Sequence, residues 1–306
     1  MNKMTVVNAP RRKVRNKIHI GGYTFDVVNA VFLILFCAIV LLPFLRVLAI
    51  SLSSSRMIDR HMVGIWPREL NVKGYEIVFS KTTIYRSYGW TLLYSLTYTA
   101  ISVSMTACLA YPLSVSDFVL RKPISILLLI TMFFSGGTVP AYLLIRNLGL
   151  MDTLWALVLP GAVGAWNTFL YRAFFKGISH EIREAALIDG AGELRILLRI
   201  IVPLSKALFA TFSLFAIVGM WNSYFAAMLY IKNPDRQPIQ NILRSIVYTS
   251  VTATFSDASI AMTNGSVNTL NVQYACLVAT IAPLLLIYPF IQKYFEQGMQ
   301  VGAVKG

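Results

Sequence analysis

The stretch SHEIREAALIDGAGELRILLRIIVP, residues 179–203, is a polar interruption between long apolar segments of the chain. Residues 181–188 have the spacing of a short amphipathic helix with one apolar stripe. Asp189-Gly190-Ala191 supplies a turn, because glycine tolerates left-handed backbone geometry. Residues 193–202 resume as a helix, and Pro203 marks the entry to the next apolar segment. The stretch therefore predicts a helix–turn–helix that lies either along a membrane surface or in a groove on a soluble partner.

The composition is that of an integral membrane protein. Hydrophobic residues make up 57% of the 306 positions and charged residues only 13%, whereas soluble domains carry about 25% charged residues. The formal net charge is +14. Because the basic residues flank apolar segments, they indicate membrane topology and contact with anionic lipid rather than a nucleic-acid partner.

Six apolar segments are long enough to be membrane-spanning helices, which need about 20 residues. They cover residues 27–50, 90–115, 124–145, 153–175, 207–231 and 270–290. The third segment is interrupted by Ser135-Gly136-Gly137-Thr138-Val139-Pro140, which predicts a break in the helix. A kinked helix that lines a path and a simple packing kink fit this break equally well. The sequence therefore predicts an all-α integral membrane protein with six transmembrane helices.

The distribution of Lys and Arg predicts the orientation. An even number of spans places both termini on the same side of the membrane. With the N-terminus inside, Lys and Arg number 16 in the inner segments and 10 in the outer loops, which favours cytoplasmic termini. We expect a basic N-terminal segment over residues 1–26, a transmembrane domain over 27–295 and a tail over 296–306. The polar stretch then lies in the cytoplasm, and loop 51–87 forms an ordered cap at the outer surface.

Residues for catalysis or metal binding form no recognisable pattern in the sequence. There is no G-x-x-x-x-G-K-[ST] phosphate loop, so any ATP hydrolysis requires another chain. The three cysteines lie in apolar runs and the three histidines are scattered, which leaves no metal or nucleophile–base pattern. The spans are nearly free of acidic residues, which argues against a proton-relay carrier. We therefore expect no catalytic residue, metal site or cofactor in this chain.

Three pieces of the polar stretch keep the spacing of a known motif. The pieces are Glu184-Ala185-Ala186, Asp189-Gly190-Ala191, and Ile200 with Val202-Pro203. Together they resemble the EAA loop of ABC importer permeases, with Val202 in place of the usual leucine. The tail, QKYF at 292–295 through GAVKG at 302–306, is similar to the second permease of maltose-type carbohydrate importers. The sequences FFSGGTVPAYLLI at 133–145 and WNS at 221–223 resemble the branch that takes up complex oligosaccharides or polysaccharide fragments.

The resemblance implies a type I ABC importer permease that moves a carbohydrate across the bacterial cytoplasmic membrane by alternating access. The polar stretch would be a coupling helix that docks into a cleft on an ATPase. The coupling residues implied are Glu184, Ala185, Ala186, Asp189, Gly190 and Ala191. The partners implied are a second, homologous permease in a heterodimer, two ABC ATPase subunits that bind ATP and Mg, and an extracytoplasmic solute-binding protein.

Aromatic and amide side chains inside two of the spans have the chemistry that binds sugars. They are Trp166, Asn167, Trp221, Asn222 and Tyr224. Helix–helix hydrogen bonding and interfacial aromatic positions explain these residues at least as well. The basic balance of the outer loops is compatible with an acidic saccharide. A permease for another solute, such as a peptide or an anion, and a membrane scaffold or enzyme are the alternative functions.

Overall fold

The computed structural model describes residues 20–251 and 268–303, and the regular structure within these ranges is helical apart from one isolated bridge between Ser53 and Leu70. Three helices are long and apolar enough to cross a membrane, over Phe25–Ser51, Thr82–Ser114 and Thr269–Leu286. Two bent helix pairs each add one candidate span, which gives three to five in the described residues. Most of the predicted basic segment, residues 1–19, and the last three residues of the tail lie outside the described residues.

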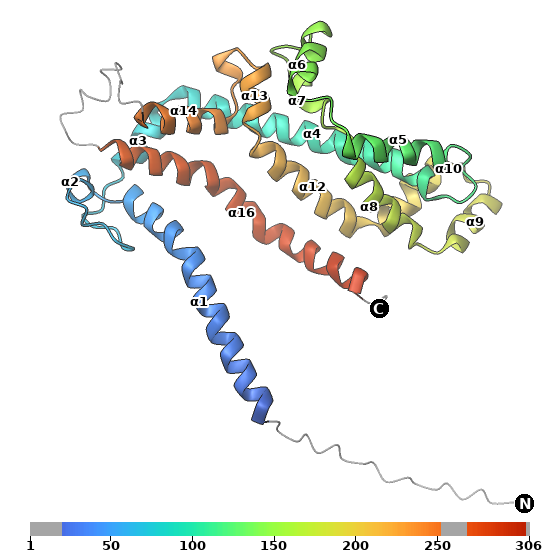
Figure 1. Cartoon of the computed structure of the whole chain (residues 1–306), viewed down its shortest axis with the longest axis horizontal. Coiled ribbons are helices and arrows are strands. Elements are labelled where there is room, and N and C mark those ends of the chain that lie inside the picture. The colour runs from blue at the N-terminus through green and yellow to red at the C-terminus, as the bar shows by residue number, and fades with distance from the viewer. Residues whose placement is uncertain (1–19, 252–267, 304–306) are drawn as a thin grey trace, which may run out of the picture.

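Figure 1 shows the arrangement of the helices. In chain order they are α1 (Ile20–Ser51), α2 (Ser55–Asp59), α3 (Lys73–Ser80), α4 (Thr82–Ser114), α5 (Arg121–Phe133), α6 (Thr138–Asn147), α7 (Trp155–Val158), α8 (Ala165–Lys176), α9 (His180–Ile188), α10 (Glu193–Ile196), the π-helical turn η1 (Leu197–Ile201), α11 (Val202–Leu204), α12 (Lys206–Trp221), α13 (Phe225–Tyr230), the 3₁₀ turn η2 (Pro234–Arg236), α14 (Ile239–Val251) and α16 (Thr269–Ala303).

The long helix α4 is the element around which the others pack. α8 and α12 lie along it, and α3, α5, α7, α14 and η2 also contact it. One hydrophobic core joins the last turns of α4 to α8, the polar loop and α12. Its buried residues are Ala107, Ala110, Tyr111, Tyr171, Phe175, Ala186, Ile196, Leu197, Ile201 and Leu208. The polar loop, defined as residues 179–203, is therefore anchored in the core of the protein through its apolar side chains.

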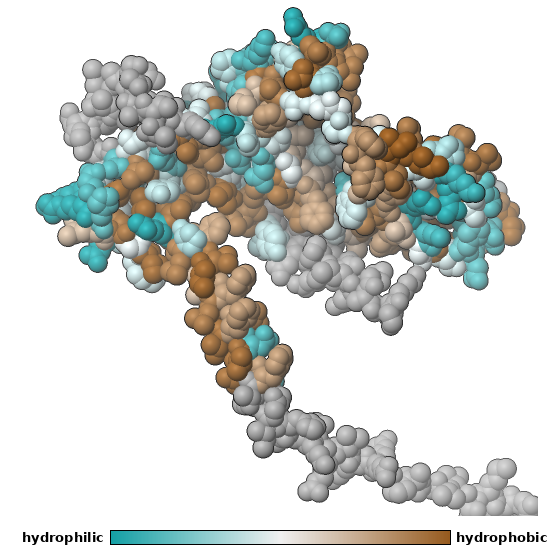
Figure 2. All heavy atoms as spheres, in the orientation of Figure 1, coloured by the Kyte–Doolittle hydropathy of each residue, from teal (hydrophilic) through white to brown (hydrophobic). Residues whose placement is uncertain are grey.

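Helix α1 leaves most of its apolar surface uncovered. It packs against α16 near one end and diverges from the other helices along the rest of its length (Figure 1). None of the residues in its most hydrophobic 18-residue window is buried. Figure 2 shows this helix as an almost continuous hydrophobic surface. Such a surface needs lipid or another apolar helix around it, as expected of a membrane protein.

The predicted break in the third span is confirmed. α5 ends at Phe133 and α6 begins at Thr138, and the two helices meet at an angle of 116°. Gly137, between them, has a φ of +85°, a backbone conformation that glycine adopts without steric cost. The chain can therefore reverse its course here, and α6 projects away from the helices around α4 (Figure 1).

The expectation of one continuous helix over residues 153–175 is wrong. The segment forms α7 and α8, which are separated by residues 159–164. Pro160 lies in this gap and cannot donate a backbone hydrogen bond, and Gly161 and Gly164 lower the cost of leaving the helix. Hydropathy alone missed the break because the gap is as apolar as its flanks. Residues 159–164 therefore form a short non-helical segment beside α4.

The loop over residues 51–87 is ordered, as predicted. Asn271, at the start of α16, donates hydrogen bonds from its Nδ2 to the carbonyl oxygens of Ile50, Ser51 and Ser53 at 3.0–3.1 Å. Gly74 of α3 lies so close that a Cβ atom placed on it would be 2.1 Å from Asn271 Oδ1. These contacts bind the end of α1, α3 and α16 into one unit. The position of this unit outside the membrane stays a prediction.

Candidate functional site

The polar loop adopts the predicted helix–turn–helix. α9 ends at Ile188, and Gly190 has a φ of +77°. The N–H of Ala191 donates to the carbonyl of Ala186 at 2.9 Å, and the N–H of Gly190 donates to the carbonyl of Leu187 at 3.0 Å. This pair of bonds is a Schellman motif, in which the residue at the position of Gly190 must be left-handed. The turn therefore depends on glycine for its backbone, since a Cβ atom at Gly190 would meet no neighbour within 4 Å.

The coupling residues predicted from the sequence divide into buried and displayed positions. Ala186 is only 6% exposed and packs against the core around α4, and Ala191 is half-buried beside it. Glu184, Ala185, Asp189 and Gly190 are exposed. Their neighbour Ile188 is 87% exposed. The loop thus packs one face against the core of its own chain and leaves the other face exposed.

A polar contact fastens both arms of the loop to α4. Arg183 of α9 forms an ion pair with Glu193 of α10, with two contacts between the guanidinium and the carboxylate. Tyr111 of α4 donates its hydroxyl proton to Glu193 Oε2 at 2.6 Å. The hydrogen bond to Glu193 raises the pKa of Arg183 above its ordinary value, so this residue stays cationic throughout the physiological range. The network fixes the angle between the two arms and their register on α4.

The link between the loop and α12 is a sharp bend. The segment Glu193–Leu204 meets Lys206–Trp221 at 85°. Within the first arm, residues Leu197–Ile201 form a π-helical turn, a feature that the sequence did not predict. At the bend Ser205 is fully buried, and its N–H donates to the carbonyls of Ile201 and Val202 at 3.0 and 3.1 Å. The joint between the loop and α12 is therefore both buried and hydrogen-bonded.

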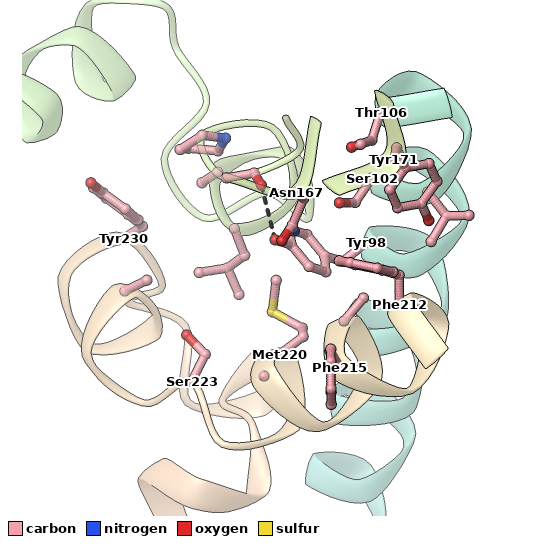
Figure 3. Close-up of a pocket in the computed structure, with 18 residues that line it drawn as sticks. Tyr98, Ser102, Thr106, Asn167, Tyr171, Phe212, Phe215, Met220, Ser223 and Tyr230 are labelled. Atoms are coloured by element: carbon pink, nitrogen blue, oxygen red, sulfur yellow. Dashed lines mark hydrogen bonds between the residues drawn. The ribbon is translucent and has the colours of Figure 1, made fainter. Parts of the chain in front are cut away.

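A groove of about 450 Å³ lies between α4, α7, α8, α12 and α13. Its lining residues are Tyr98, Ser102, Val103, Thr106, Ala156, Leu157, Pro160, Gly161, Asn167, Tyr171, Phe212, Phe215, Ala216, Gly219, Met220, Ser223, Ala226 and Tyr230. Figure 3 shows the polar members on walls contributed by different helices. Tyr98 donates a hydrogen bond from its hydroxyl to the Gly161 carbonyl at 2.9 Å, across the gap between α4 and the non-helical segment. None of the residues that line the groove is charged.

Of the five predicted path residues, the structure places Asn167 in this groove. Trp166 is 60% exposed and does not line it. Trp221 is buried, packs against Tyr88, and donates from Nε1 to the carbonyl of Thr280 at 3.3 Å. This position agrees with the alternative given by the sequence, in which Trp221 serves helix–helix hydrogen bonding and not sugar binding.

The last two predicted path residues lie near α14. Asn222 accepts a hydrogen bond on Oδ1 from Gln240 Nε2 at 3.1 Å. Tyr224 lies beneath the guanidinium of Arg244, whose Cζ is 4.6 Å from the ring centre. Neither residue lines the groove.

Sequence reasoning missed the polar residues of α4 and Tyr171, although a signal was present. Tyr98, Ser102 and Thr106 are spaced four apart, and so are Asn167 and Tyr171. Residues four apart share one face of a helix, so each set marks a polar stripe on an apolar span. Small and hydroxyl-bearing residues on a span are also typical of close helix packing, so the stripe on α4 has two interpretations in the sequence. In the described ranges, His, Cys, Asp and Glu form no cluster of three that could hold a metal ion.

Comparison with known proteins gives a consistent result. The family described as "Binding-protein-dependent transport system inner membrane component" matches residues 79–301. Protein LplC of Bacillus subtilis (strain 168) is 38% identical over 287 residues, which cover 94% of this chain and 96% of LplC. The polygalacturonan/rhamnogalacturonan transport system permease protein YtcP of the same organism is 36% identical over 282 residues, covering 92% of this chain and 98% of YtcP.

A solved structure extends the comparison to the fold. It is a chain from a bacterial ABC transporter involved in the import of the acidic polysaccharide alginate. The two chains superpose with a TM-score of 0.84 at 30% sequence identity, over 90% of this chain and 98% of that one. The helix–turn–helix, the helical membrane fold and these matches lead to one assignment: the chain belongs to the binding-protein-dependent transport system inner membrane components, as a multi-pass permease of the carbohydrate-uptake type of ABC importer.

Proposed function

We propose that this chain is one of two homologous permease subunits of an ATP-driven importer. It spans the bacterial cytoplasmic membrane six times, with both termini in the cytoplasm. The six spans are α1, α4, the α5–α6 pair, α7 with α8, α12 with α13, and α16. The packing of α8 along α4 supports counting the broken segment 153–175 as a span, although neither of its helices is long enough alone.

The polar loop is the site where an ATPase subunit docks. The single observation that carries this proposal is the division of the loop into a buried and a displayed face. Ala186 is held in the core, while Glu184 and Ile188 face outward two turns or less from the Gly190 bend. A short helix of this kind fits a cleft on a partner as a preformed knob, with little entropy lost on binding. Two ATPase subunits bind ATP and Mg²⁺, one docking on each permease, and this chain holds no cofactor.

Movement of the ATPases drives transport through the rigid joints of the loop. Closure of the ATPase pair around ATP draws the two docking loops together. The contact between Glu193 and Tyr111 passes this displacement to α4, and the buried bend at Ser205 passes it to α12. Both helices line the groove, so the groove opens alternately to the two sides of the membrane.

The cargo that we propose is an oligosaccharide released from an acidic polysaccharide. The names of YtcP and of the alginate transporter refer to acidic polymers, and both are at least 30% identical to this chain over most of its length. An extracytoplasmic binding protein delivers the saccharide to the outer loops, where Lys and Arg outnumber Asp and Glu. The opposite charge there favours the approach of an anionic cargo.

Copurification and coupled assays test this function. The chain is expressed with its neighbouring permease, ATPase and binding-protein genes, and the complex is reconstituted in liposomes. We expect ATPase activity that rises with loaded binding protein, together with uptake of oligogalacturonate. Glu184→Ala should lower both by about tenfold while the chain still inserts, and Asp117→Ala, an exposed acid in the turn between α4 and α5, should change neither. Complex assembly and uptake unaffected by Glu184→Ala would overturn the docking role, and uptake of peptides in place of saccharides would overturn the cargo.

A further inference from the structure

The groove contains two buried hydroxyl groups that have no hydrogen-bond partner in the described part of the chain. They are Thr106 Oγ1 and Tyr171 OH, on side chains that are 2% and 1% exposed. Buried polar atoms in folded proteins almost always have a partner, so an unpaired one requires an explanation. Phenylalanine and valine would fill the same volumes without this penalty. The two hydroxyl groups therefore point to a ligand that pairs with them.

The Tyr171 hydroxyl is held in a fixed position by the aromatic rings around it. Phe175, Phe209 and Phe212 contact the Tyr171 ring edge-on, with ring centres 5.8, 5.6 and 4.8 Å away. Edge-to-face contacts of this kind fix the plane of a ring. The hydroxyl group is thus preorganised at the groove wall and loses little freedom when it binds a ligand.

Three further polar side chains share this wall. Ser102 lies one helical turn before Thr106 on α4, and Tyr98 lies one turn before Ser102 on the same face. Asn167 lies one turn before Tyr171 on α8. Figure 3 shows Ser102, Thr106 and Tyr171 grouped at one end of the groove, with Asn167 and Tyr98 beside them. Two helices therefore bring hydroxyl and amide groups together on one wall of the groove.

The chemistry of this wall selects for ligand hydroxyl groups. Ser, Thr, Tyr and Asn side chains both donate and accept hydrogen bonds, and they carry no charge at neutral pH. An isolated carboxylate in such a groove would lack a counter-ion and pay a large desolvation cost. A sugar ring offers hydroxyl groups that donate and accept in the same way, and its C–H faces suit the rings of Tyr98, Phe212 and Phe215. These three rings also line the groove.

We infer that Thr106 and Tyr171, with Ser102 and Asn167 beside them, form a saccharide subsite that reads ring hydroxyl groups and not carboxylates. This inference rests on the proposed function and deepens it. All four residues of the subsite come from this subunit, and none of them is charged. The carboxylates of an acidic saccharide are therefore bound by groups outside the subsite. Acidic and neutral oligosaccharides that pass through the groove bind the subsite through the same contacts.

The test measures binding to the complete complex of both permeases and both ATPases in nanodiscs, with the binding protein omitted. The probes are labelled trigalacturonate, which is acidic, and raffinose, which is neutral. Tyr171→Phe and Thr106→Val each remove one hydroxyl group. We expect each change to weaken binding of both probes by about 3- to 10-fold. Thr106→Ser keeps the hydroxyl group and should bind as the unchanged complex does.

Ser95→Ala is the matched control. Ser95 lies on the same helix, is fully buried and also has an unpaired Oγ, but it does not line the groove. Its replacement should leave binding of both probes unchanged. Equal binding by Tyr171→Phe, Thr106→Val and Ser95→Ala would overturn the subsite, and so would an effect on trigalacturonate alone. A complex of unchanged sequence that neither binds nor takes up a saccharide would instead overturn the proposed function, and the subsite with it.

Discussion

Arg183 and Glu193 face each other across the turn at Gly190 and form an ion pair that closes the two arms of the polar loop. Their side chains are 16% and 50% exposed. Pairs with this much solvent contact contribute only about 0.2–1 kcal/mol to stability. The pair therefore matters chiefly for geometry, because Glu193 also accepts the hydroxyl proton of Tyr111 and so sets the loop on α4.

Replacing Arg183 with methionine tests this geometric role. We expect little change in thermal stability, since the ion pair is partly solvated. We expect transport per ATP hydrolysed to fall severalfold, because the two arms no longer move as one body. Arg86→Met is a suitable control, as Arg86 forms an exposed ion pair with Asp235 remote from the loop. A ratio of transport to hydrolysis that is the same in both variants would show that the contact does not transmit movement.

Replacing Gly190 with alanine tests the turn. The left-handed φ of +77° costs about 1–2 kcal/mol for a residue with a Cβ atom. We expect weaker copurification of the ATPase and faster amide exchange in α9. Gly192→Ala is the matched control two residues away. Gly192 has a φ of −72°, which alanine accepts, and a Cβ atom there meets no neighbour within 4 Å. Similar exchange rates in both variants would contradict the backbone argument.

Replacing Gly74 with alanine tests the packing of the cap on α16. An added Cβ atom would lie 2.1 Å from Asn271 Oδ1 and 3.1 Å from the Asn271 carbonyl oxygen. Both contacts are too short, and overpacking of this kind costs about 1–3 kcal/mol. We expect a fall of several degrees in the melting temperature of the purified complex. Gly89→Ala, on α4 with no neighbour within 4 Å of the added atom, should maintain or raise the melting temperature.

The carboxylate of Asp152 gives a prediction about pH. The backbone N–H groups of Asn233 and Lys232 donate to its Oδ1, and these bonds lower the pKa of Asp152 below its ordinary value. A lowered folded-state pKa means that the stabilisation is fully present above the ordinary value of about 3.9 and is lost as the pH falls through the folded-state pKa. The hydrogen bonds from Lys232 and Asn233 to Asp152 should therefore be unchanged from pH 5 to 8.

Hydrogen exchange at the amides of Lys232 and Asn233 measures this effect. After correction for the intrinsic rate, protection should stay constant from pH 5 to 8 and decrease only below about pH 4. Asp152→Asn keeps an acceptor oxygen and tolerates the φ of +59° at this position, so it isolates the charge. This variant should show weaker protection that no longer varies with pH in the acidic range. Loss of protection near neutral pH in the unchanged protein would contradict the assignment.

Local patterns in the sequence determined the polar loop and the break in the third span. The turn at Gly190 and the break at Gly137 have φ values that other residues rarely adopt. Glycine in the Asp189-Gly190-Ala191 turn, and two glycines followed by Pro140 in the third span, were therefore enough to predict them. The helices on either side of Gly190 follow from apolar periodicity over a few residues. Hydropathy located the long helices α1, α4 and α16, because burial in lipid depends on composition summed over a span.

Only the tertiary structure decided which residues form the groove and how the loop is joined to it. Trp221 and Asn167 carry equally suitable chemistry in the sequence, yet one packs against α16 and the other lines the groove. The position of a side chain depends on how helices far apart in the chain cross one another, and hydropathy says nothing about that angle. The same holds for the contact between Tyr111 and Glu193, which are 82 residues apart. Sequence spacing predicted where the chain turns and which segments cross the membrane. The packing of α4 against α8 and α12 determined which side chains line the groove.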